Sequence, residues 1–243
     1  METRNGYGQF CPVAMAAEVL CTRWTPLLVR EMIAGSTRFN DLRRGVPRMS
    51  PALLSKRLGE LEEAGIVERF KGRGVEEYRL TAAGMALRGV IEGLGFWGQR
   101  WVETELSLKN LDPSLLMWDM RRNLDMTPLP PRRCTIQFLY PELSESRQNW
   151  WLVVEPARDA TETRGADLCY TDPGFEVDLY VESSLRTMTS IWMGFSTVAD
   201  ELRAGRLQMS GSVALRESMQ RWLGLSPFAK GRAPKELEPV MGK

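Results

Sequence analysis

The sequence predicts two domains: a mainly α winged helix-turn-helix with a β-hairpin wing at 1–105, and an α+β domain at 112–228 with a mainly antiparallel sheet covered by helices. We expect a flexible tail at 229–243. A chain of 243 residues exceeds a typical single domain. Helical apolar periodicity dominates the first hundred residues, whereas strand-like runs follow in the second half. A hydrophobic content of 43% indicates a folded globular protein.

The composition excludes several classes of site. The chain has no histidine, which rules out Ser-His-Asp and Cys-His catalysis and histidine-ligated metals. Its four cysteines, Cys11, Cys21, Cys134 and Cys169, form no CxxC pair, so we expect reduced thiols. We therefore expect no catalytic residue, no metal and no cofactor. Because the sequence shows neither a signal peptide nor a long apolar stretch, we expect a cytoplasmic protein that does not contact a membrane.

The first domain has the helix boundaries of a helix-turn-helix. Apolar periodicity predicts helices at 24–34 and 39–44, and a turn at 45–48 follows. Ser50-Pro51 then supplies the cap and first position of the next helix. That helix is expected to end at Gly65, which can adopt the left-handed cap conformation. Its predicted buried face holds Leu54, Leu58 and Leu61.

Basic residues gather on this helix-turn-helix. Residues 38–57 carry six basic side chains against one acidic residue, Asp41. Strands predicted at 66–71 and 75–80 flank Gly72-Arg73-Gly74, which is typical of a basic wing. An isolated charge run is usually a solvated face, but this order of elements favours a helix in the major groove of DNA. The predicted DNA-binding residues are Arg38, Arg48, Ser50, Ala52, Ser55, Lys56, Arg69, Lys71 and Arg73.

The segment from Cys11 to Trp101 holds irregularly spaced phrases, among them Arg23-Trp24-Thr25, Gly65-Ile66-Val67 and Glu77-Tyr78-Arg79-Leu80-Thr81. Because these phrases agree together, the segment resembles the HxlR-type winged-helix regulators, which are MarR-like. The resemblance implies a sequence-specific transcription regulator whose partner is double-stranded DNA and which acts as a homodimer.

A long helical pattern after Thr81 presents an apolar ridge with glycines between its members. Such a ridge suits a helix–helix dimer interface, and the resemblance implies the same role for this helix and for the helix from Pro12; the alternative is a place in the chain's own core. Cys11 lies at the start of that first helix, where a helix dipole favours the thiolate. It is the candidate redox-sensing residue, the alternative being a buried residue at the dimer seam. The ridge consists of Leu87, Ile91, Leu94, Trp97 and Trp101.

The second half begins with Asp112-Pro113, which caps a new helix. The phrases Asp178-Leu179-Tyr180-Val181 and Leu207-Gln208-Met209-Ser210-Gly211 stand within an element order over 112–228 that resembles the sterol carrier protein type of lipid-binding domain. Such domains enclose an apolar tunnel, which implies an apolar small-molecule effector; the alternative is a fully packed domain that serves only as a second dimerisation surface. The candidate ligand-binding residues are Trp150, Trp151, Trp192 and Trp222. Strands are expected at 134–140, 150–155, 166–170, 175–182 and 206–210, and helices at 185–193, 198–204 and 213–223.

Two other functions remain open at this point. An enzyme or carrier acting on a lipid-like or acyl ligand would use the winged helix as an interaction module, but the sequence shows no nucleophile elbow and no phosphate loop. A winged helix that binds protein instead of DNA would require the basic run to be buried. The sequence therefore favours a DNA-binding regulator that is not an enzyme.

Overall fold

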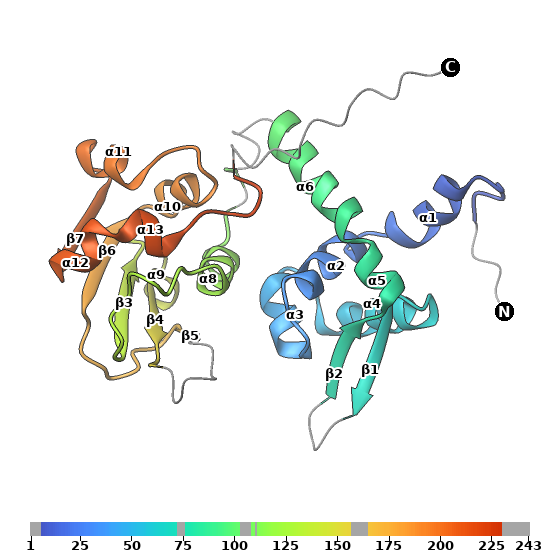
Figure 1. The fold of residues 1–243 in the computed structure, drawn as a ribbon, viewed down its shortest axis with the longest axis horizontal. Helices are drawn as coiled ribbons and strands as arrows, with labels where there is room; N and C mark the ends of the chain where they lie inside the picture. The colour runs from blue at the N-terminus through green and yellow to red at the C-terminus, as the bar shows by residue number, and fades with distance from the viewer. Residues whose placement is uncertain (1–5, 72–75, 103–107, 110, 157–164, 230–243) are drawn as a thin grey trace. The chain divides into compact units, whose positions relative to one another are not determined.

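The computed structural model describes residues 6–71, 76–102, 108–109, 111–156 and 165–229 (Figure 1). The chain divides into two compact units, 1–95 and 96–243, and the division falls inside one helix, upstream of the expected boundary at 105. Arg73 and nearly all of the expected tail lie outside the described residues. Within the described ranges, no helix combines the length and apolarity needed to span a bilayer.

Unit 1 contains the predicted helix-turn-helix and the two wing strands. The strands pair antiparallel, with Val67 opposite Leu80 and Lys71 opposite Glu76. The predicted helix-turn-helix and wing strands are confirmed, with shifts of one or two residues at their ends, whereas the long helix expected after Thr81 is divided at Leu87. The elements are α1 (Pro12–Leu20), α2 (Thr25–Ile33), α3 (Phe39–Gly45), α4 (Pro51–Glu63), β1 (Val67–Lys71), β2 (Glu76–Leu80), α5 (Ala82–Ala86) and α6 (Arg88–Trp101).

Local sequence signals fix both ends of α4. The Ser50 hydroxyl accepts a hydrogen bond from the Leu53 amide at 3.3 Å, and Pro51 occupies the first turn. After the helix, Gly65 adopts a φ of +69°, which a residue with a side chain rarely tolerates. The predicted apolar face is also confirmed. Leu54, Leu58 and Leu61 are buried in the core of unit 1 together with Leu28, Met32, Leu42, Val46, Met49, Val67 and Tyr78.

Unit 2 is an α+β unit with one five-stranded sheet. Its core contains side chains from the strands and from helices α8, α10 and α13. The elements are α8 (Pro113–Arg122), β3 (Cys134–Leu139), α9 (Glu145–Gln148), β4 (Asn149–Val154), β5 (Ala166–Cys169), β6 (Leu179–Ser183), α10 (Leu185–Trp192), α11 (Val198–Arg203), β7 (Leu207–Gly211), α12 (Val213–Glu217) and α13 (Met219–Leu223).

The prediction of a mainly antiparallel sheet is wrong, because the sheet is mixed. Its strand order is β5-β4-β3-β6-β7, and the central strands β3 and β6 run parallel, with Ile136 opposite Leu179. A parallel neighbour needs a crossover longer than a hairpin turn. The segment between β5 and β6 forms this crossover, so the strand expected at 175–182 begins only at Leu179.

The start of β6 is held by hydrogen bonds to β3. The Asp178 carboxylate accepts from the Thr135 amide at 2.9 Å, and the Asp178 amide donates to the Thr135 carbonyl at 2.9 Å. Arg132 adds an ion pair to the same carboxylate at 2.6 Å. Asp178 therefore ends the crossover and sets the register of the parallel pair. The closing helix expected at 213–223 is also divided, into α12 and α13, at Ser218.

Candidate nucleic-acid interface

The face of α4 opposite its buried stripe is exposed to solvent. Small and basic side chains occupy it, as the helical periodicity predicts. The turn before α4 and the residue before α3 add further exposed side chains. Every predicted DNA-contact residue that the structure describes is exposed: Arg38, Arg48, Ser50, Ala52, Ser55, Lys56, Arg69 and Lys71.

Several cations on this surface have no acidic neighbour. Among the described side chains, Arg38, Arg43, Arg48 and Lys56 form no ion pair, whereas Arg44 lies 3.5 Å from Asp41. Unpaired exposed cations attract phosphates more strongly than cations already neutralised by carboxylates. The surface formed by these four residues is therefore suited to an anionic polymer. A protein-binding role would need this basic run to be buried, but these four side chains are exposed.

Arg57 differs from the other members of the basic segment. Its Nε donates to the Arg23 carbonyl at 3.3 Å, and its Nη1 pairs with Glu60 one turn along α4. The side chain is only 17% exposed. From the sequence, Arg57 is expected to belong to the basic surface, because charge alone does not show which way a side chain points.

Arg69 in the wing is engaged within the chain. Its guanidinium lies 3.1 Å from Glu76 and 3.6 Å from Glu62, and it stacks over the Tyr78 ring at 5.3 Å. These contacts connect the wing to the end of α4. A phosphate contact by Arg69 would therefore have to compete with two carboxylates. Lys71 is exposed at the end of β1 and forms no ion pair among the described side chains.

A buried acidic residue supports the turn before α4. Glu31 of α2 is fully buried, pairs with Arg30 at 2.5 Å and accepts from the Ser36 hydroxyl at 3.4 Å. Arg30 also donates to the Gly45 carbonyl at 3.0 Å. A Cβ on Gly45 would lie 1.9 Å from the Glu31 carboxyl group, so a larger residue there would displace that carboxylate. The sequence does not reveal this contact, since a glutamate in an amphipathic helix is normally exposed.

The apolar ridge of the long helix divides in the structure. Ile91 is buried in its own chain and Leu87 is half-buried. A stripe at helical spacing remains open: Val90, Leu94, Trp97 and Trp101 are 56%, 55%, 59% and 65% exposed. Helix α1 buries no residue at all and exposes Val13 and Met15. Exposed aromatic and aliphatic side chains of this density mark a contact surface.

Comparison with known proteins assigns the DNA-binding unit. A family model described as HxlR-like helix-turn-helix matches residues 19–106. The transcriptional regulator YvaP of Bacillus subtilis, named as HTH-type and uncharacterized, is 34% identical over 99 residues, which cover 39% of this chain and 92% of YvaP. The chain belongs to the HxlR-like helix-turn-helix family.

Further relatives are similar to the same part of the chain. The HTH-type transcriptional regulator YodB of B. subtilis is 33% identical over 97 residues, 38% of this chain and 87% of YodB. The solved structure of the redox regulator HypR in its reduced form is 32% identical and covers 40% of this chain and 99% of HypR, with a TM-score of 0.37. The family model ends at residue 106, so the sterol carrier-like character of unit 2 stays a prediction.

Cys11 occupies the N-cap of α1 in this HxlR-like protein. The nearby backbone amides of Ala14 and Val13 favour the thiolate and so lower the pKa of the thiol. The side chain is half-buried, and α1 has no buried residue beneath it. The position therefore favours a thiolate that solvent can reach. Cys21 is exposed at the opposite end of the same helix.

The four tryptophans predicted to bind a ligand do not all share one face. Trp150 and Trp151 are consecutive in β4, so their side chains point to opposite faces of the sheet. Trp150, Trp192 and Trp222 belong to the helix-covered core. The Trp222 indole donates to the Leu215 carbonyl at 2.8 Å, and the Trp150 indole donates to the Arg147 carbonyl at 2.7 Å. Three of the four therefore lie in one packed core, whereas Trp151 lies on the other side of the sheet.

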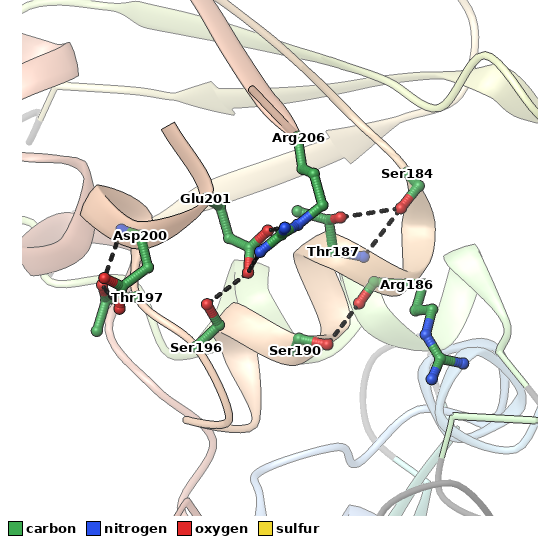
Figure 2. Close-up of polar contacts among 9 residues, drawn as sticks. All are labelled: Ser184, Arg186, Thr187, Ser190, Ser196, Thr197, Asp200, Glu201 and Arg206. Carbon is green, nitrogen blue, oxygen red and sulfur yellow. Dashed lines mark hydrogen bonds and ion pairs between the residues drawn. The ribbon is translucent and has the colours of Figure 1, made fainter. Parts of the chain in front are cut away.

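A polar cluster in unit 2 has a structural explanation (Figure 2). The buried Glu201 carboxylate accepts from Arg206 at 2.6 and 3.1 Å and from the Ser196 hydroxyl at 2.5 Å. The Arg206 hydrogen bond is the main reason that the pKa of Glu201 is lowered. Thr197 caps α11 through the Asp200 amide. The cluster connects α11 to β7 and satisfies its own polar groups, so we assign it no chemistry.

Proposed function

We propose that this protein is a DNA-binding transcription regulator that inserts α4 into the major groove of its operator as a homodimer. The observation that carries the proposal is the exposed, unpaired basic surface on a capped helix followed by a wing hairpin. The curated relatives, which are named as transcriptional regulators, support the same role rather than an enzyme or carrier.

The contacts divide into two kinds in this proposal. Ala52, Ser55 and Lys56 face the base edges, while Lys71 and Arg73 of the wing contact phosphates. Lys71→Ala is expected to weaken binding to all sequences alike and to lower the slope of log affinity against log salt by about 0.9. Lys56→Ala is expected mainly to reduce discrimination between operator and random DNA. Salt titrations of both variants check this, and equal effects of the two changes would contradict the division.

The dimer is proposed to form through the exposed stripe of α6 and through α1. Symmetry of the protein then requires a palindromic operator, with half-sites about one helical turn or a small multiple of it apart. The solvent exposure of Val90, Leu94, Trp97 and Trp101 supports this assignment over an intrachain core.

Unit 2 is proposed to bind an apolar effector with one polar group. The shared core position of Trp150, Trp192 and Trp222 supports this, as does the Ser183 hydroxyl, which is buried without a hydrogen-bond partner among the described residues. An effector can change DNA affinity only if the two states of the regulator bind it unequally. Fatty acids, sterols and aromatic metabolites should then include a ligand that changes tryptophan emission saturably, and that change should be lost in Ser183→Val. A screen without any change in emission or operator affinity would favour a packed domain.

Cys11 is proposed as a reactive thiol that modulates DNA binding. Because its pKa is lowered, we expect its alkylation to reach half-maximal rate at a pH below that of a free thiol, about 8.5. The Cys11→Ser variant provides the control, since it retains Cys21. Alkylation of Cys11 that leaves operator binding intact would contradict a sensing role.

A further inference from the structure

We infer that Arg57 is a positioning residue of the DNA-binding unit: it holds α4 against the turn between α1 and α2 and does not contact DNA. The inference rests on the proposed DNA-binding function. It concerns the one basic residue of α4 that the structure turns inward.

The contacts of Arg57 lie entirely within unit 1. Its Nε donates to the carbonyl of Arg23, 34 positions earlier in the chain, at 3.3 Å. Its Nη1 pairs with Glu60, which aligns the guanidinium along the helix. Its neighbour Lys56 is exposed and forms no ion pair among the described side chains. Lys56 and Arg57 therefore carry the same charge, but Lys56 faces solvent whereas Arg57 contacts other residues of unit 1.

The turn that Arg57 contacts is strained. Trp24 has a φ of +79°, and no other residue with a side chain has a positive φ in the described part of the chain. A bulky residue remains in this conformation only when surrounding contacts hold it there. Arg57 donates to the carbonyl of Arg23, the residue immediately before Trp24, and the Arg23 guanidinium stacks over the Trp24 ring at 5.5 Å. Arg57 is thus one of the groups that keep this turn in place.

Close packing between α4 and α1 is interrupted at this junction. A partly open pocket of about 20 Å³ lies between the two helices and the turn, with Glu18, Thr22 and Glu60 in its lining. A cavity of that size admits one water molecule, and these polar side chains can bind it. Leu54, Leu58 and Leu61 pack α4 into the core, and the hydrogen bond from Arg57 adds a directional contact at its edge, near this pocket.

Arginine and lysine differ in a way that separates positioning from phosphate contact. Lysine keeps the positive charge but lacks the Nε donor and the planar guanidinium that bind the Arg23 carbonyl and Glu60 together. A phosphate contact would survive Arg57→Lys and would be lost in Arg57→Gln. A positioning contact would be lost in both variants.

The test compares the full-length wild type with Arg57→Lys and Arg57→Gln on two duplexes. One carries the operator that the wild type selects from a random pool, and the other is a scrambled sequence of equal length. We expect both variants to lose on the order of tenfold in operator affinity, with unchanged scrambled-duplex affinity and an unchanged salt slope. Lys71→Gln is the matched control and should lower the slope by about 0.9. Near-normal binding by Arg57→Lys, with a lowered slope for Arg57→Gln, would overturn the inference.

Loss of binding to the scrambled duplex would reveal an Arg57 variant that does not fold. A second variant keeps the test decisive in that case. Glu60→Gln leaves every proposed DNA contact in place and weakens the alignment of the Arg57 guanidinium. We expect it to reduce operator discrimination at an unchanged salt slope. A Glu60→Gln protein that binds both duplexes more tightly with a steeper slope would show that Arg57 contacts phosphate once released. A wild type that selects no sequence would instead overturn the proposed function itself.

Discussion

Replacing Leu94 by glutamate is expected to convert the dimer into monomers and to lower operator affinity on the order of a thousandfold. Leu94 lies at the centre of the exposed stripe of α6, between Val90 and Trp97. A carboxylate buried there in each protomer would lose its hydration without a partner. A dimer that contacts two half-sites at once binds DNA far more tightly than a monomer on one half-site, so loss of the dimer removes that gain in affinity. Sedimentation at micromolar concentration and operator titration measure the two effects.

The control for this change lies on the opposite side of the same helix. Arg88→Gln breaks an exposed ion pair to Glu92 at 3.5 Å and leaves the apolar stripe intact. It is expected to leave both the oligomeric state and operator affinity unchanged, since exposed pairs of this kind contribute little. A wild type that sediments as a monomer, or a Leu94→Glu protein that remains a dimer, would refute the assigned interface.

Trp222→Ala is expected to lower the free energy of unfolding of unit 2 by about 3–5 kcal/mol. The indole is fully buried in the core, and its N–H donates to the Leu215 carbonyl. The change removes a large apolar volume and also leaves that carbonyl without its indole donor. Chemical denaturation followed by circular dichroism measures the loss.

Trp151→Ala is the matched comparison for this prediction, because Trp151 lies on the other face of the sheet and outside the main core. We expect a smaller loss there. A Trp222→Ala protein as stable as the wild type would show that the helix-covered core is not what stabilises unit 2.

The sequence predicts those features of unit 1 that depend on neighbouring residues. Ser50 and Pro51 start α4 and Gly65 ends it through contacts that span only a few positions. The apolar period of α4 likewise depends on the helix alone. For these reasons the exposed and buried faces of the recognition helix could be predicted before the fold was known.

Contacts between distant residues could not be predicted in this way. The Arg69 pair with Glu62 and the Arg57 bond to the Arg23 carbonyl depend on how separate elements pack. The burial of Glu31 beneath Gly45 also depends on tertiary packing. Charge patterns identified a basic surface but did not show which of its members point inward.

The sheet of unit 2 illustrates the same division. Strand-like apolar runs located its strands, because such a run is a property of one strand. The parallel pairing of β3 and β6 depends instead on a crossover and on Asp178, which contacts Thr135 more than forty positions earlier. Successive strands suggested hairpins, and the position of β6 overturned that expectation.

The most direct test of the central claim is equilibrium binding of the full-length protein to a random duplex pool, followed by footprinting of the selected sequence. We predict a palindromic site bound by a dimer, with affinity that falls steeply with salt and discrimination that Lys56→Ala reduces. A pool that yields no enriched sequence, with no protection of any duplex at physiological salt, would contradict the assignment of this surface to DNA recognition.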